Sequence, residues 1–176
     1  SLGRSNMSID QYEHDFVHLA QVDLPKYLMD LKAGMKNPLS MSEFAIDGLG
    51  VSGLCRRLGL EGDFPGCYVL MENETPIYVG ISKNVMKRLR QHVRGKTHFD
   101  ASLAYKIATH SLPHQHTRSV AMEQKAFKSE FDSAKEYLRS MNVVYVKITN
   151  PLVLYVFEPY CAMQFNTEQW NTFETH

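Results

Sequence analysis

The stretch GCYVLMENETPIYVGISKNVMKRLRQH, residues 66–92, decides how this chain folds. It contains two short runs with β-strand character, residues 67–71 and 76–80, and each run has a tyrosine beside a glycine. The intervening ENETP is typical of a turn. We therefore expect an antiparallel hairpin with a loop of about five residues.

A basic helix is predicted to follow the hairpin directly. Val85, Leu89 and Val93 recur at a spacing of four residues and form an apolar stripe along it. Ser82 or Asn84 can provide the N-cap, since both residue types accept hydrogen bonds from the first free backbone amides.

Outside this stretch, apolar periodicity predicts helices over residues 9–34, 51–60, 101–108, 119–137 and 151–165. Pro25 should break the first of these or open its second part, and Pro159 should lie near a helix start or a kink. Residues 143–148 alternate and are β-branched, which indicates a third strand. The expected fold is α+β: a small mixed or antiparallel three-stranded sheet flanked by helices, with an N-terminal helical extension and a helical insertion.

The composition limits the classes of protein to which this chain can belong. At 176 residues with 44% hydrophobic residues, the chain is long enough for one globular domain with a buried core. No apolar run approaches the roughly 18 residues that a membrane span requires. Its start, SLGRSNMS, resembles a tag remnant rather than a secretory signal. Three cysteines without CxxC spacing argue against a disulfide-linked partner and favour a cytoplasmic location.

The formal net charge is zero, but basic residues are concentrated in one segment. No acidic residue occurs between Ile81 and Phe99, whereas six basic ones do: Lys83, Lys87, Arg88, Arg90, Arg94 and Lys96. Such a local patch can bind phosphate groups even when the total charge is balanced.

One competing motif is GLGVSG at residues 48–53, which matches the GxGxxG pattern of dinucleotide-binding sites. Glu72 lies about 20 residues downstream, where a ribose-binding acid belongs. However, the preceding SEFAID is a poor strand, and a hairpin rather than a crossover follows Glu72. These glycines are better interpreted as closing a turn and opening a short helix.

The hairpin instead resembles the GIY-YIG nuclease family. Gly66-Cys67-Tyr68 stands where GIY belongs, and Tyr78-Val79-Gly80 stands where YIG belongs, about ten residues later. Arg88 lies eight residues past Gly80, at the position of the family's catalytic arginine, and His92 follows one helical turn later.

The resemblance extends over about residues 64–176. Lys96-Thr97-His98 resembles the family's next segment, Glu158 occupies the helix that carries its metal-binding glutamate, and Trp170-Asn171-Thr172 resembles its terminal aromatic-Asn element. Two features depart from the family: Cys67 replaces the usual isoleucine, and the stretch from His98 to Asn142 is longer. The resemblance implies a nuclease domain over 63–176 with a helical insertion around 117–140. Residues 1–62 are then the tag remnant and helical extension.

The resemblance also implies roles for individual residues. Tyr68 would act as the general base, Tyr78 would help to orient water, and Arg88 would bind the scissile phosphate through its planar fork of donors. His92 would position the phosphate or the Tyr68 hydroxyl. Glu158 would hold one Mg²⁺ or Mn²⁺ ion. Asn171 would brace the site, with Asn166 as its rival.

The function implied is a divalent-metal-dependent endonuclease that cleaves duplex or branched DNA. Lys83, Lys87, Arg90, Arg94, Lys96 and His98 would contact the DNA. The alternative is a catalytically inactive nucleic-acid-binding module on the same fold. His114 and His116 form a short HxH pattern that could bind a transition metal, but no third ligand accompanies them.

Overall fold

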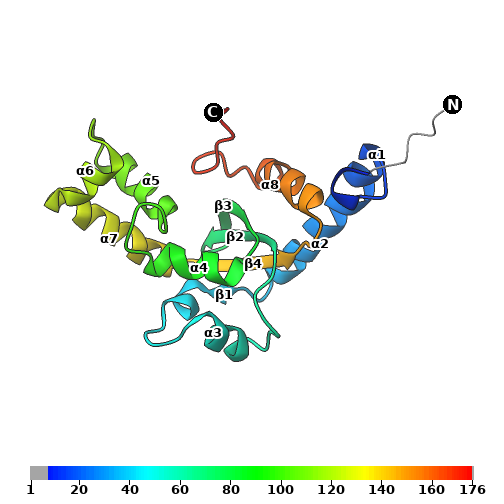
Figure 1. Ribbon diagram of the computed structural model, residues 1–176, viewed down its shortest axis with the longest axis horizontal. Coiled ribbons are helices and arrows are strands. Elements are labelled where there is room, and N and C mark those ends of the chain that lie inside the picture. Colours follow the sequence, from blue (N-terminus) through cyan, green and yellow to red (C-terminus); the bar gives the residue numbers. More distant parts are fainter. Residues whose placement is uncertain (1–7, 176) are drawn as a thin grey trace.

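The computed structural model describes residues 8–175 and has a four-stranded antiparallel sheet at its centre (Figure 1). Strands β2 (Gly66–Glu72) and β3 (Thr75–Ser82) form the expected hairpin, and β4 (Asn142–Lys147) pairs with the other side of β2. The short strand β1 (Leu39–Ser40) adds a fourth member, so that the order is β1-β4-β2-β3. The α+β prediction is therefore confirmed. The tag remnant predicted at the start of the chain falls largely outside the described residues.

The hairpin turn is tighter than predicted. Glu72 pairs with Thr75, which leaves a two-residue loop, Asn73–Glu74, instead of five residues. Asn73 has a φ of 56°, a conformation that asparagine tolerates better than most residues. The register shifts between Leu70 and Met71, and this irregularity accommodates Pro76 in the edge strand.

Two hydrophobic cores cover the two faces of the sheet. Tyr68 and Leu70 of β2 point toward one core, and Cys67, Val69 and Met71 point toward the other. Side chains alternate along a strand, so the central strand must be apolar throughout to be buried on both faces. This double burial explains why residues 67–71 lack a polar/apolar alternation.

Helices α2 (Leu24–Gly34) and α8 (Pro151–Phe165) cover the second face. Chain from Phe16 to Gly34 is continuously helical through α1 (Phe16–His18) and the π-helical segment η2 (Leu19–Asp23), and Pro25 sits at the start of α2. A short 3-10 turn, η1 (Ile9–Gln11), precedes them. Pro159 lies inside α8, not at its start.

The first face is covered by the remaining helices (Figure 1). They are η3 (Met41–Ala45), α3 (Val51–Arg57), α4 (Val85–Arg94), α5 (Ser102–Ser111), α6 (Arg118–Glu123) and α7 (Lys125–Arg139). The helix expected over 119–137 is thus two helices. Gln124 is extended between them, with φ −77° and ψ 124°.

The N-terminal extension is part of this fold. It contributes β1 to the sheet, α2 to one core and Phe44 of η3 to the other. The GxGxxG glycines follow η3 and open α3, and no strand leads into them, so the dinucleotide interpretation lacks its required strand. Within residues 8–175 no helix combines the length and hydropathy needed to cross a membrane.

Candidate active site

Both ends of α4 are fixed by charged side chains from distant parts of the chain. At the N-terminus, Asp63 accepts hydrogen bonds from the backbone amides of Met86 (2.8 Å) and Lys87 (2.9 Å). The expected local caps do not act in this way, since Asn84 makes no side-chain capping bond and Ser82 bonds only the Asn84 amide. An acidic group at a helix N-terminus satisfies free amides and complements the helix dipole.

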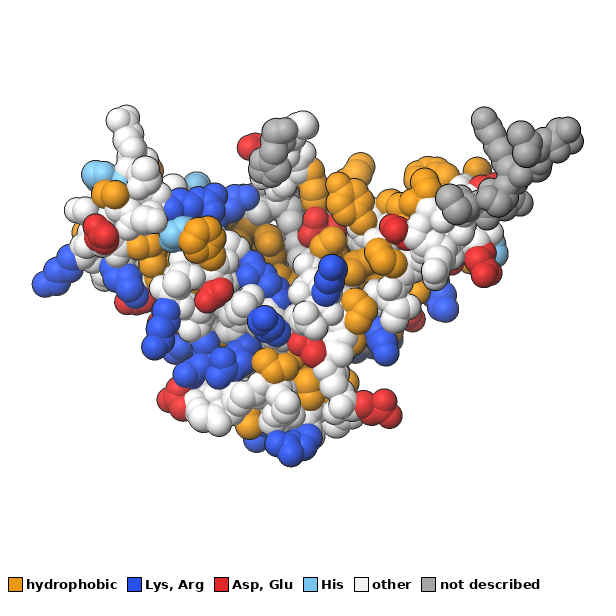
Figure 2. All heavy atoms as spheres, in the orientation of Figure 1, with side chains coloured by type: hydrophobic (Ala, Val, Ile, Leu, Met, Phe, Trp, Pro, Cys, Tyr) orange, Lys and Arg blue, Asp and Glu red, His pale blue; other side chains and the backbone are white. Residues whose placement is uncertain are grey.

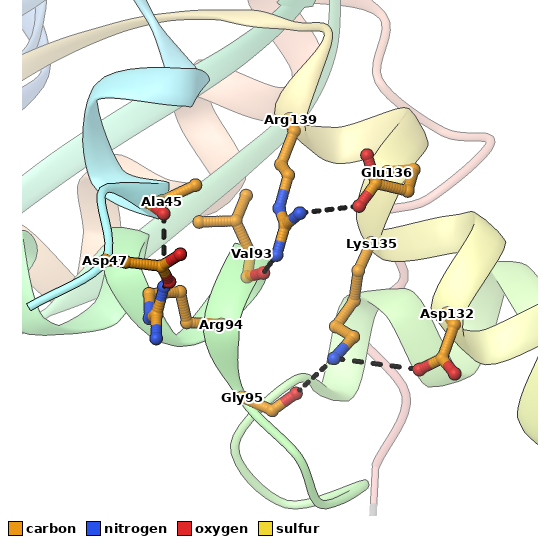
Figure 3. Close-up of polar contacts among 9 residues, drawn as sticks. All are labelled: Ala45, Asp47, Val93, Arg94, Gly95, Asp132, Lys135, Glu136 and Arg139. Carbon is orange, nitrogen blue, oxygen red and sulfur yellow. Dashed lines mark hydrogen bonds and ion pairs between the residues drawn. The ribbon is translucent and has the colours of Figure 1, made fainter.

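At the C-terminus of α4, two cations of α7 take the free carbonyls (Figure 3). Arg139 donates to the Val93 carbonyl at 3.1 Å, and Lys135 donates to the Gly95 carbonyl at 3.1 Å. Basic groups at this end again complement the dipole. The helix is therefore held rigidly, which fixes the direction of the side chains in its middle.

His92, in the last turn of α4, is fully buried against the hairpin tyrosines. Its Nε2 lies 2.7 Å from the Tyr68 hydroxyl, and its Nδ1 has no hydrogen-bond partner among the described residues. Burial, together with the nearby charge of Arg88, lowers the pKa of His92 to about 3. His92 is consequently a neutral hydrogen-bond partner of Tyr68 at neutral pH.

The two tyrosines of the motif lie together but differ in exposure. Tyr68 is 1% exposed, whereas Tyr78 is half-buried and faces a cleft; their ring centroids are 6.4 Å apart. Burial raises the pKa of Tyr68 well above its usual value, and the charge of Arg88 partly opposes this. Burial also raises the pKa of Tyr78.

The motif glycines are required by this packing. A Cβ atom on Gly80 would lie 2.2 Å from Cζ of the Tyr68 ring, and one on Gly66 would lie 2.2 Å from the Val146 carbonyl oxygen. Both distances are far shorter than van der Waals contact. Gly80 thus makes room for the tyrosine, and Gly66 for the neighbouring strand.

Arg88 is oriented by neutral groups. Its guanidinium donates to the Asp100 carbonyl and the Ser102 hydroxyl, each at 2.7 Å, and to the Gln91 side chain at 3.2 Å. No carboxylate within residues 8–175 forms an ion pair with it. Its positive charge is therefore available to an anion.

The cleft beside these residues has a volume of about 530 Å³. Its walls are Tyr78 of β3, one face of α5, Arg118, Glu158 of α8 and residues 170–174. Figure 2 shows Lys and Arg side chains along the arm formed by α5 and α6, on the side toward the C-terminal segment.

Glu158 is half-buried in the cleft wall, and burial raises the pKa of its carboxyl, an effect that the Ile81 backbone partly offsets. No cationic side chain of the described residues pairs with it. A carboxylate in this position fits a hard divalent cation, which takes oxygen ligands and completes its shell with water or substrate phosphate. In the described part of the chain, no three His, Cys, Asp or Glu side chains gather as a metal-binding cluster. His114, of the HxH pattern, lies 2.9 Å from the Tyr105 hydroxyl.

Asn171 holds β3 beside the site. Its side-chain amide donates to the Val79 carbonyl and accepts from the Val79 amide, both at 2.8 Å. Thr167 donates to the same Asn171 oxygen. The rival Asn166 is the left-handed C-cap of α8 and is exposed.

The residues predicted to contact DNA divide into two groups. Lys83, Lys87 and Lys96 are exposed and form no ion pair within the described residues. By contrast, three others are occupied by the protein itself: Arg90 donates to the Leu49 carbonyl, Arg94 pairs with Asp47 and donates to the Ala45 carbonyl, and His98 is buried against Phe99 and Tyr105. These three residues thus have intramolecular partners, which a run of cations in the sequence does not reveal.

Sequence reasoning missed three residues that the structure places at the site. Asp63 fixes α4, while Lys106 and Arg118 line the cleft. Lys106 lies four residues after Ser102 on the same side of its helix, so helical spacing could have suggested it. Nothing in the sequence signals Asp63 or Arg118, whose positions depend on tertiary packing.

Comparison with known proteins supports the hairpin resemblance. Residues 64–137 match the family model of the GIY-YIG catalytic domain. The match contains both tyrosines, Arg88 and His92, and it ends before Glu158 and Asn171. No curated protein and no solved structure matches the chain.

Proposed function

We propose that this protein, a member of the GIY-YIG nuclease family by the match of residues 64–137 to the model of the family's catalytic domain, is a divalent-metal-dependent endonuclease that hydrolyses DNA. One observation carries the proposal: the Tyr68 hydroxyl lies 2.7 Å from His92 Nε2, beside an arginine without a carboxylate partner. This arrangement supplies a proton acceptor and a phosphate ligand at the same place.

Tyr68, as the phenolate, accepts the proton of the attacking water. His92, in the tautomer that carries its hydrogen on Nε2, donates a hydrogen bond to the Tyr68 oxygen and helps to stabilise that phenolate. The water oxygen attacks phosphorus, and the bond from phosphorus to the leaving 3′-oxygen breaks. The charge of Arg88 also favours the phenolate, because it opposes the effect of burial on the pKa of Tyr68.

Arg88 binds the scissile phosphate. Its planar guanidinium offers two parallel donors to two phosphate oxygens, which a lysine ammonium cannot reproduce. The bonds to Asp100 and Ser102 hold the group in place before substrate arrives, so little reorganisation is needed at the reaction. Lys83, Lys87 and Lys96 extend the positive field along the DNA backbone.

Glu158 would hold one Mg²⁺ or Mn²⁺ ion in the cleft. When bound, such an ion neutralises phosphate charge and stabilises the departing oxygen. Tyr78 faces the same cleft, where its hydroxyl orients the water, and Asn171 keeps β3 and therefore Tyr78 in position.

A plasmid-nicking assay tests the proposal. Supercoiled DNA is incubated with the protein in Mg²⁺, in Mn²⁺ and in excess EDTA, and the Tyr68→Phe variant is run in parallel. We expect nicked circles with either metal, none with EDTA and almost none with the variant. DNA binding without nicking in any metal would favour the inactive binding module. Equal nicking by the variant would point to a contaminating nuclease.

A further inference from the structure

The helix α5 presents a continuous face to the cleft. Ser102, Tyr105, Lys106 and Thr109 all line it, and their spacing of i, i+3, i+4 and i+7 places them on one side of the helix. Arg88 bonds the first of these residues, so the proposed scissile-phosphate site lies at the N-terminal end of this face.

Arg118 of α6 lies against the middle of this face of α5, over Tyr105. Its guanidinium carbon lies 5.4 Å from the centroid of the Tyr105 ring, in cation–π geometry. Ser102 and Tyr105 are three residues apart, or about 4.5 Å along the axis at 1.5 Å per residue. Two guanidinium groups therefore contact α5 in succession: Arg88 bonds Ser102 beside the cleft, and Arg118, which lines the cleft, lies over Tyr105.

The ring against which Arg118 lies is itself held in place. Tyr105 is 8% exposed, packs against Phe127 of α7 with ring centroids 5.2 Å apart, and bonds His114 through its hydroxyl at 2.9 Å. Tyr105 therefore cannot swing away. Arg118 itself is exposed and forms no ion pair within the described residues, so its donors remain available.

We infer that Arg118, held against Tyr105, binds a second, non-scissile backbone phosphate of the DNA strand that is cut. The inference rests on the proposed function for its substrate. A flat guanidinium without a carboxylate partner, in a cleft beside the proposed scissile-phosphate site, is suited to the next phosphate of the strand, because it carries charge and a fork of donors that matches two phosphate oxygens. The strand would then run along α5 and be held at two points.

Salt-dependent DNA binding tests this role. A fluorescent duplex is titrated in EDTA, so that nothing is cleaved, at several salt concentrations with wild type, Arg118→Gln and Arg118→Lys. We expect Arg118→Gln to bind roughly five- to tenfold more weakly near physiological salt, and to reduce the slope of log affinity against log salt by about one. Arg118→Lys should keep the slope, because it keeps the charge.

Arg56→Ala is the matched control. Arg56 is an exposed arginine of α3, a helix that contributes no residue to the cleft lining, and its removal should leave both affinity and slope unchanged. A wild-type slope in Arg118→Gln would overturn the inference while leaving the nuclease proposal intact. Equal losses in the Gln and Lys variants would also overturn it, because charge would then not matter. A wild type that neither binds nor nicks DNA would overturn the nuclease proposal together with the inference.

Discussion

Arg88 and Arg94 belong to one helix, six residues apart, yet the structure uses them in opposite ways. Arg88 is held by a hydroxyl, a carbonyl and an amide, and its charge is left uncompensated within the described residues. Arg94 is paired with Asp47 and bonded to the Ala45 carbonyl, where it fastens the N-terminal extension to α4. We call the face of α4 that carries Arg88 and His92 the site half, and the C-terminal end that carries Arg94 the scaffold half.

The difference teaches that a basic segment cannot be interpreted from its charges alone. An arginine whose partner is a carboxylate has its charge neutralised and is worth about 1 kcal/mol or less of stability at a surface. An arginine fixed by neutral acceptors has its geometry set but keeps its charge. The following experiments ask whether activity follows the site half and stability follows the scaffold half.

The largest effect is expected for Glu158→Gln, which keeps the shape of the side chain and removes its charge. Cleavage in Mg²⁺ should become undetectable or very low, with partial rescue in Mn²⁺, which binds more tightly to nitrogen- and oxygen-donor sites. Thermal unfolding should show no loss of stability, since burial already disfavours the charged carboxylate. Full activity in a stable variant would show that Glu158 does not bind the metal. A loss of stability with unchanged specific activity would show that its role is structural.

Tyr68→Phe should reduce the cleavage rate by about 10²–10⁴, the usual value of a group that transfers the proton. DNA affinity should change little, because the ring remains. The lost hydroxyl leaves His92 Nε2 without its partner, which should cost about 1–3 kcal/mol of stability in denaturant unfolding. Tyr78→Phe is the matched variant, and if it proved the more damaging of the two, the two tyrosines would exchange roles.

Arg88→Lys should reduce cleavage by about 10²–10³ with normal folding, because the charge is kept while the two-pronged contact is lost. Single-turnover rates at saturating DNA measure this directly. A rate near that of wild type would show that Arg88 is not needed for cleavage, and that it does not differ from Arg94 in this respect.

Low pH should destabilise the folded protein through His92. The pKa of His92 is about 3 in the folded protein and near the ordinary value of about 6.5 when unfolded, so the unfolded chain binds more protons between these values. The contribution of His92 to the free energy of unfolding should therefore be fully present above about pH 6.5, and it should decline as the pH falls toward 3. Urea titrations at several pH values should show a flatter profile for His92→Gln.

The smallest effect is expected for Arg94→Gln. It should lower the free energy of unfolding by about 0.5–1 kcal/mol through loss of the partly exposed pair with Asp47, and the loss should shrink in high salt. Cleavage should stay within about twofold of wild type, because an exposed ion pair contributes little energy. A tenfold loss of DNA affinity in this variant would restore Arg94 to the DNA-binding surface.

Much of the fold followed from local pattern. The hairpin, the third strand and the apolar stripes of α2 and α4 were predictable because each is written in the spacing of neighbouring residues. The two-residue strand β1 was not, since two residues carry no periodicity. The break at Gln124 was equally hidden, because neither glycine nor proline marks it.

At the site, the sequence placed Tyr68, Tyr78, Arg88 and His92 through a motif whose members lie close along the chain. It could not separate free cations from occupied ones, because the partners of Arg90 and Arg94 lie more than 40 residues away. Asp63 was missed because it lies just outside the hairpin in sequence. Its role as a cap of α4 depends on the packing of that helix against it. Long-range pairing is a property of the fold and not of the local pattern.

The contact of Asn171 with Val79 has a consequence for association between molecules. β3 is an edge strand, and an edge with free amide and carbonyl groups is a template for another strand. By taking both polar groups of Val79, the asparagine side chain imitates the neighbouring strand that is missing there. It thereby protects this part of the sheet edge, beside the hairpin tyrosines, from pairing with a second molecule.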